Sequence, residues 1–110
     1  MLEAMWSLEF ISSQQRGGYG IAVLETGRIF GGDSSCIYIG SYEVKNDIVH
    51  ALVKVTNDRG ILQTIFGDLK EFTLVLNGRA DQDSFVLEGH MQEHPEQRMD
   101  VRLTRRAELP

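Results

Sequence analysis

The three histidines are the first candidates for chemistry, because two of them lie close to an acidic residue in the sequence. His90, Glu93 and His94 have side chains that bind zinc, and on a helix the two histidines would share one face. Here His90 ends an alternating segment and His94 is followed by Pro95, which is incompatible with a regular helix. We therefore expect a solvated hairpin loop here and no metal site.

Nucleophilic catalysis would require a nucleophile and a base held together, and no known motif frames such a pair in this sequence. The single cysteine, Cys36, precedes an apolar segment, so we interpret it as a small buried thiol. His50 has the same parity as Ile48 and Leu52, which makes it a candidate for an inward polar group, most simply a hydrogen-bonded core histidine. We expect no catalytic residue, no cofactor and no enzymatic activity.

Two other segments could bind anions. Residues 17–20 (GGYG) have the glycine content of a phosphate-binding loop, but such a loop requires a helix directly after it, and a strand pattern follows here. Near the C-terminus, Arg102 and Arg106 share the outward side of the last strand, where Glu88 has the matching parity for a cross-strand ion pair. We expect a solvated face, with a docking patch for an acidic partner as the alternative.

The composition is that of one soluble domain. The 110 residues are 42 % hydrophobic and 25 % charged, and the net charge of −5 disfavours direct binding to nucleic acid. The sequence has no cationic and apolar leader and no apolar run of the roughly 20 residues that cross a bilayer, so we expect no membrane association. One cysteine excludes an intrachain disulfide and fits a reducing compartment. We expect a single domain over residues 1–110, located in the cytoplasm.

Alternation of apolar and polar residues recurs along the chain and indicates strands. Gly40 lies inside one strand and indicates a bulge or a close backbone approach, and residues 58–66 are interpreted as one short helical turn or strand. Turn residues separate the strands at 25–27, 45–47 and 77–83. The predicted fold is all-β, an eight-stranded antiparallel up-and-down barrel of lipocalin-like shape. The expected strands are residues 6–10, 19–23, 28–30, 36–44, 48–56, 72–77, 85–90 and 99–104.

An eight-stranded barrel encloses an interior that side chains fill or that holds one small ligand. The large apolar residues with the expected inward parity would line this interior, and we expect a filled core as the simpler case. A cavity for a small apolar ligand is the alternative. The expected lining residues are Trp6, Phe10, Tyr38, Leu52, Phe72 and Phe85.

The order and spacing of several short motifs in the first sixty residues resemble the GrlR-type negative regulators of type III secretion. The motifs are the opening strand 5–12 (MWSLEFIS), the strand 18–21 (GYGI), the turn around Gly27, and residues 31–33 (GGD) followed by Tyr38 and Gly40. The second half of the chain matches less specifically. The resemblance implies a lipocalin-like barrel, a homodimer, and a function in sequestering a helix-turn-helix transcriptional activator.

The chain departs from this family in one functional segment. The family's regulator carries a surface acidic stretch, Glu-Asp-Glu-Asp, directly before the strand that begins here at Ile48. The corresponding residues are Val44, Lys45, Asn46 and Asp47, of which Asp47 alone is acidic. The segment Glu43 to Asp47 is still the best candidate for contact with a protein partner. The leading hypothesis is a non-enzymatic regulatory module that binds a protein, and a carrier of a small apolar ligand is the alternative.

Overall fold

The computed structural model describes residues 2–12, 16–57 and 70–110. The short helical turn expected within residues 58–66 lies outside these ranges. Among the described residues, no helix is long and apolar enough to cross a membrane. They form eight strands, which are β1 (Ala4–Ser12), β2 (Arg16–Glu25), β3 (Arg28–Gly32), β4 (Ile37–Lys45), β5 (Ile48–Thr56), β6 (Glu71–Arg79), β7 (Ser84–Met91) and β8 (Arg98–Ala107).

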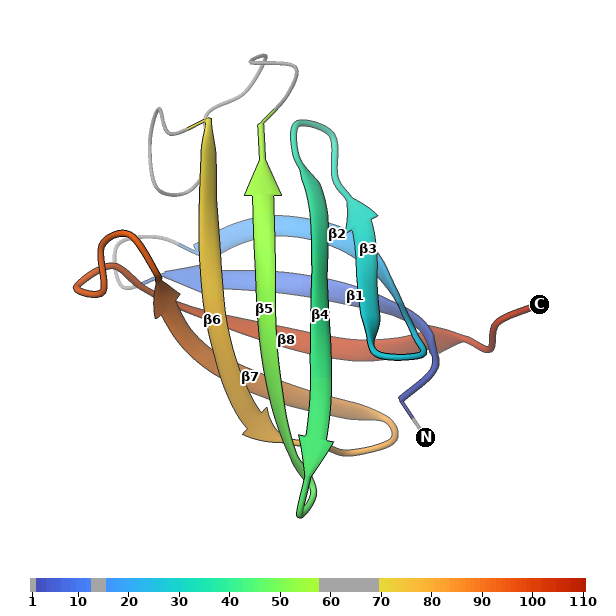
Figure 1. The fold of residues 1–110 in the computed structure, drawn as a ribbon. Helices are drawn as coiled ribbons and strands as arrows, with labels where there is room; N and C mark the ends of the chain where they lie inside the picture. Colours follow the sequence, from blue (N-terminus) through green and yellow to red (C-terminus); the bar gives the residue numbers. More distant parts are fainter. Residues whose placement is uncertain (1, 13–15, 58–69) are drawn as a thin grey trace.

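The strands form a closed barrel in chain order, so the predicted eight-stranded up-and-down topology is confirmed. Every strand runs antiparallel to the next, and β8 returns to pair with β1 from Met5 opposite Ala107 to Ser12 opposite Met99. Figure 1 shows β1, β2 and β8 crossing behind the upright β4, β5 and β6. Closure pairs the first strand with the last and removes the two edges that an open sheet would expose.

Two tight turns confirm the predicted hairpins and explain the registers around them. Thr26 and Gly27 join β2 to β3 with φ angles of 51° and 77°, and Asn46 and Asp47 join β4 to β5 with φ angles of 53° and 66°. Two consecutive residues with positive φ are typical of the type I′ turn, whose twist matches that of a two-residue hairpin. Thr26 is the unusual member, because a β-branched residue rarely adopts this conformation.

Gly40 is explained by a close approach between strands and not by a bulge. The register of β4 is regular against both neighbours, with Gly40 opposite Ile29 on one side and Val53 on the other. A side-chain carbon at this position would collide with the carbonyl oxygen of Leu52 and would lie 2.8 Å from the Cα atom of Val53. The glycine therefore lets β4 and β5 approach each other where the barrel wall curves.

The core follows the predicted alternation on β1, β6, β7 and β8, and it corrects the prediction on β5. Leu52 was expected to face inward but is 45 % exposed, and His50, of the same parity, also lies on the outer face. Lys54 shares this parity, and a charged side chain favours the solvent side. The inward residues of β5 are instead Val49, Ala51, Val53 and Val55.

Candidate functional site

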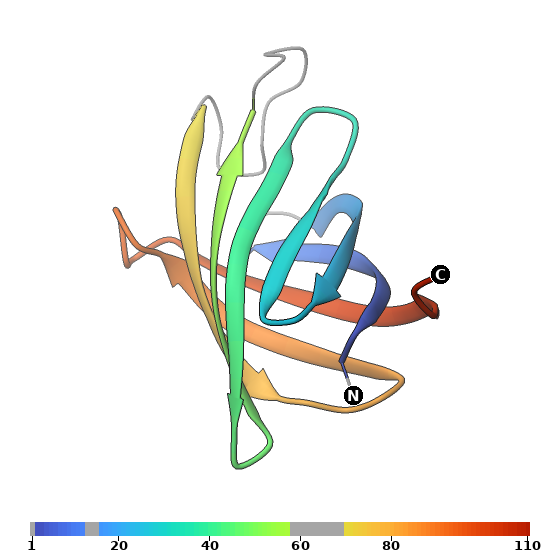
Figure 2. The same cartoon turned by 45° about the vertical axis from the view of Figure 1, so that its right-hand side comes forward.

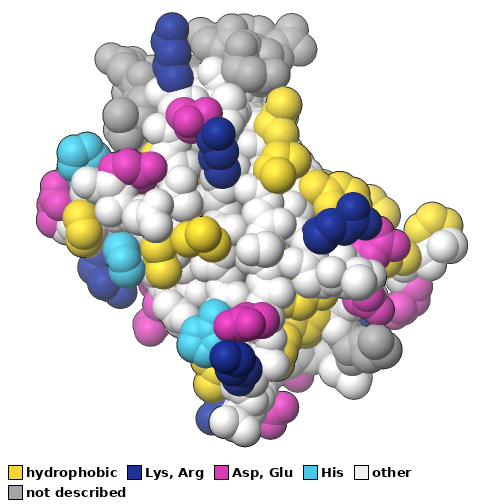
Figure 3. All heavy atoms as spheres, viewed as in Figure 1, with side chains coloured by type: hydrophobic (Ala, Val, Ile, Leu, Met, Phe, Trp, Pro, Cys, Tyr) yellow, Lys and Arg dark blue, Asp and Glu magenta, His cyan; other side chains and the backbone are white. Residues whose placement is uncertain are grey.

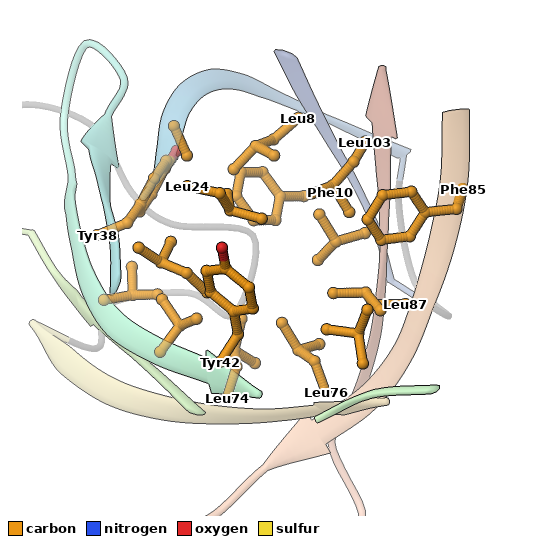
Figure 4. Close-up of a pocket in the computed structure, with 16 residues that line it drawn as sticks. Leu8, Phe10, Leu24, Tyr38, Tyr42, Leu74, Leu76, Phe85, Leu87 and Leu103 are labelled. Atoms are coloured by element: carbon orange, nitrogen blue, oxygen red, sulfur yellow. The ribbon is translucent and has the colours of Figure 1, made fainter. Parts of the chain in front are cut away.

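Described residues from all around the barrel enclose a small apolar cavity of about 40 Å³. Figure 4 shows large side chains from opposite walls pointing toward each other around it, among them Phe10, Tyr38 and Phe85, as predicted. Trp6 and Phe72 are buried in the core but do not line the cavity, and Leu52 lies outside the barrel. Sites for small organic ligands occupy roughly 300–1,000 Å³, so this cavity is too small for one.

Aromatic side chains account for the filled interior. Trp6 packs edge-to-face on Phe85 with ring centroids 5.2 Å apart, and Phe10 packs similarly on Tyr38 at 5.3 Å. Tyr42 also turns its ring toward the cavity (Figure 4), and burial is the main cause that raises the pKa of its phenol. The predicted lining residues therefore act mainly as packing, and the space between them remains small.

Trp6 and Arg105 pack on each other where β1 pairs with β8. The indole nitrogen of Trp6 donates to the carbonyl of Leu2 at 2.8 Å, and the guanidinium of Arg105 lies 4.9 Å from the centre of the indole ring. The Nε atom of Arg105 also donates to the carbonyl of Gln82 at 2.6 Å, and its side chain pairs with Glu108 at 3.2 Å. Arg105 is therefore a structural residue that ties the β6–β7 loop to the C-terminal segment.

The loop between β3 and β4 is held in place by Asp33. Its carboxylate accepts the backbone N–H groups of Ser35 and Cys36, both at 2.8 Å, and the hydroxyl of Tyr38 donates to its other oxygen. Burial raises the pKa of the Tyr38 phenol, and the bond to the neighbouring Asp33 carboxylate raises it further. Cys36 is buried, as predicted, with its sulfur 3.7 Å from the Ser35 hydroxyl. This cluster fixes the β3–β4 loop, and its groups have a structural role.

The histidines do not converge on a site. The Nδ1 atom of His94 lies 3.8 Å from a carboxylate oxygen of Glu96. The carboxylate of Glu93 accepts a hydrogen bond from the backbone N–H of Thr73 at 3.0 Å, and this bond is the main cause that lowers the pKa of Glu93. His50 contacts Asn77 on the outer face of the sheet. In the part of the chain that the structure describes, no group of three or more histidine, cysteine or acidic residues could hold a metal ion.

The basic residues of β8 lie outward, but the expected ion pair with Glu88 does not match the register. Arg102 and Arg106 are exposed, as predicted. Glu88 lies opposite Asp100, and Arg102 lies opposite Val86. The β7–β8 register is offset by two residues from the one that the ion pair needs, because the alternation fixes which face a residue is on but not its cross-strand partner.

The candidate partner segment, Glu43 to Asp47, is the tip of the β4–β5 hairpin and projects beyond the barrel body (Figures 1 and 2). All five residues are exposed, and Val44 is 45 % exposed despite its apolar side chain. Glu43 and Lys45 form an ion pair at 3.6 Å on the outer face. The tip is therefore a protruding, accessible segment with an apolar residue between two opposite charges.

The outer face of β2, β3 and β4 carries an exposed apolar patch that was not predicted from the sequence. Figure 3 shows hydrophobic side chains gathered over the upper part of β3 and β4. Val23, Phe30 and Ile39 follow one another across the three strands, as do Ile21, Gly32 and Ile37. The apolar patch, defined as the exposed members of these rows, consists of Ile21, Phe30, Ile37 and Ile39, which are 36–56 % exposed. The continuous apolar run 37–39 was the available signal, since both of its faces are apolar.

Comparison with known proteins leaves this geometry as the main guide to function. No protein-family model matches the chain, and no curated protein is significantly similar to it.

Proposed function

We propose that this chain is a non-enzymatic regulator that binds and sequesters a protein partner, in the manner of the GrlR-type regulators it resembles. The observation that carries the proposal is the contrast between the two sides of the barrel wall. The cavity that the described residues enclose has only about 40 Å³, whereas four large apolar side chains are exposed together on the outer face. Exposed apolar patches of this kind are typical of protein interaction sites.

The proposed partner surface is the outer face of β4. Ile37 and Ile39 lie at one end of this face, and Glu43 and Lys45 lie at the other, on the projecting hairpin. A partner that covers the whole face would bury the apolar end and meet one charge of each sign at the tip. Such a mixed surface resembles the apolar centre and polar rim of ordinary protein interfaces.

A helix-turn-helix transcriptional activator is the class of partner that the resemblance implies. We propose that it is held in the cytoplasm by this chain, which would act as a homodimer without binding nucleic acid directly. The loss of the family's acidic stretch moves the expected recognition from charge toward the apolar patch. A small apolar ligand inside the barrel is the alternative proposal, and the volume of the cavity argues against it.

The test is co-purification of the chain with a helix-turn-helix activator encoded beside its gene, together with a reporter of that activator. We expect Ile39→Glu to abolish both co-purification and repression, because it places a charge in the centre of the apolar patch. Val86→Glu is the matched control, since Val86 is also exposed, at 40 %, but lies on β7, away from β4 and the patch. Equal activity of wild type and Ile39→Glu would refute the proposed surface.

Native mass spectrometry of protein purified from its host tests the ligand alternative. We expect the masses of the single chain and of its dimer, with no added mass from a bound small molecule. A bound molecule that survives purification would favour the carrier and count against a purely regulatory barrel.

A further inference from the structure

The barrel is closed, but at the β4–β5 hairpin a short backbone edge remains outside its hydrogen-bonded wall. β3 spans Arg28–Gly32, whereas β4 spans Ile37–Lys45, and their pairing ends with Arg28 opposite Ser41. The last contact along this side is the bond from the Tyr42 N–H to the carbonyl of Gly27, at 2.9 Å. Beyond it, no strand of the described residues pairs with β4 on this side. The overhang, residues 43–45, is therefore an unpaired sheet edge.

The hairpin register fixes which backbone groups this edge presents. Lys45 and Ile48 flank the two-residue turn, so they exchange hydrogen bonds with each other, as does every second pair along β4 and β5. Tyr42 lies in the other set and bonds toward β3. Val44 belongs to the same set as Tyr42, so its N–H and C=O point away from β5 toward the open side. These two groups can pair with an added antiparallel strand.

The side chains of the overhang are complementary to a second copy of themselves. In an antiparallel pair centred on Val44, this residue lies opposite its own copy and exchanges two backbone hydrogen bonds with it. Glu43 then lies opposite Lys45 of the second copy, and Lys45 lies opposite Glu43. Both contacts join opposite charges on the same outer face. A two-fold interface has this reciprocity, since each contact occurs twice.

The competing contact within one chain is weak. Glu43 and Lys45 pair with each other at 3.6 Å, but their side chains are 63 % and 70 % exposed. An ion pair this exposed contributes little, so the loss of one such pair in each chain, with two pairs gained across the interface, opposes dimerisation only slightly. On the inner face of the overhang, Val44 is 45 % exposed in the single chain and would be partly covered by its copy.

From this geometry we propose that two copies of the chain associate by antiparallel pairing of their β4 overhangs, centred on Val44. The proposal deepens the proposed homodimer and rests on it. The two barrels become one continuous sheet at this point, with both outer faces on the same side. The two β4 faces that we assign to the partner protein are thereby placed next to each other.

Charge exchange tests this pairing by sedimentation equilibrium of the full chain. In Glu43→Lys, two Lys–Lys contacts replace two opposite-charge contacts, and in Lys45→Glu two Glu–Glu contacts do so. We expect each variant alone to dimerise at least about tenfold more weakly than wild type, because like charges directly opposite each other repel. An equimolar mixture of the two variants restores every opposite-charge contact and should dimerise as wild type does.

Removal of the edge donor gives a second, independent test. Val44→Pro lacks the N–H that pairs with the second copy, while the pairing of β4 with β5 does not use this group. We expect a folded chain by circular dichroism, with dimerisation weakened at least about tenfold. For the charge test, Lys54→Glu is the control matched to Lys45→Glu, because Lys54 is an exposed lysine of the outer face that lies away from the overhang. This variant should dimerise as wild type does.

The outcomes separate the edge from the dimer itself. Monomers at every concentration would overturn both the homodimer and the β4 pairing. A dimer that resists Val44→Pro and both charge variants would overturn the pairing alone and leave the homodimer standing. Weakened single variants whose mixture fails to recover would also overturn it, because the geometry requires reciprocal contacts.

Discussion

Replacing Tyr38 with phenylalanine tests how the β3–β4 loop is held, and its effect should depend on pH. Tyr38 is 2 % exposed, and its hydroxyl donates to the carboxylate of Asp33. A hydrogen bond to a charged acceptor contributes about 1.5–3 kcal/mol. Asp33 is partly exposed, so water can replace the lost donor and the effect falls toward the lower end. We expect Tyr38→Phe to lower the free energy of unfolding by about 2 kcal/mol at pH 7.

At high pH this difference should shrink. The pKa of the Tyr38 phenol is raised in the folded chain, mainly by burial, so the phenol stays neutral there after the unfolded chain has begun to ionise. Stability from this group is complete below the ordinary tyrosine pKa of about 10 and falls by about 1.4 kcal/mol for each pH unit above it. Phenylalanine does not titrate. At pH 11, wild type should therefore exceed Tyr38→Phe by less than about 1 kcal/mol.

Guanidinium unfolding of both proteins at pH 7 and pH 11 measures this change, and the raised pKa of Tyr42 affects both equally. Tyr19→Phe is the matched control, because Tyr19 is 69 % exposed and should change stability by less than about 0.5 kcal/mol. A difference between wild type and Tyr38→Phe that is the same at both pH values would refute the assignment of Tyr38 as a buried, neutral donor.

Three further changes test the barrel itself, each by chemical unfolding. Gly40→Ala should lower the free energy of unfolding by about 3 kcal/mol or prevent folding, because the added carbon collides with the backbone of Leu52. A variant as stable as wild type would contradict the close approach of β4 and β5. Thr26→Asn should raise the free energy of unfolding by about 0.5–1 kcal/mol, because asparagine tolerates a φ of 51° better than threonine does. A decrease would show that the hydrogen bond from the Thr26 hydroxyl to Glu3, at 3.2 Å, matters more. Arg105→Lys should lower the free energy of unfolding by about 1 kcal/mol and shift the fluorescence of Trp6. The reason is that a lysine ammonium cannot both stack on the indole ring and donate to the Gln82 carbonyl. Unchanged fluorescence would refute the stacking.

Strand order and most of the core could be predicted because turn residues and alternation are local signals. On β6, for example, Phe72, Leu74 and Leu76 alternate with less apolar residues, and all three are buried as expected. On β5 the outer face also carries the apolar residues Ile48 and Leu52, so Leu52 was assigned to the wrong side. Lys54 has the same parity as Leu52, and a lysine is rarely buried without a partner. Lys54 therefore indicated that Leu52 lies on the outer face.

The candidate surfaces depended on information that the sequence does not carry locally. The tip of the β4–β5 hairpin was predicted as an exposed turn, but its projection follows from the different lengths of β3 and β4. The packing of Arg105 on Trp6 joins residues far apart in the chain, through the pairing of β1 with β8. Such contacts follow from closure of the barrel and from the cross-strand register, which alternation alone leaves open.

Closure of the wall between β1 and β8 also has a consequence for how the chain can be rearranged. Met5 lies opposite Ala107, so the two ends of the barrel's chain meet at one rim, as Figures 1 and 2 show for the two termini. The other pairings join strands that are consecutive in the sequence. A short linker between the ends, with a new opening in the exposed loop 94–96, would therefore convert the long-range pairing of β1 with β8 into a local hairpin. Every strand would keep its neighbours. Such a circular permutant would have shorter-range contacts at the present seam, and we expect it to form that seam early in folding.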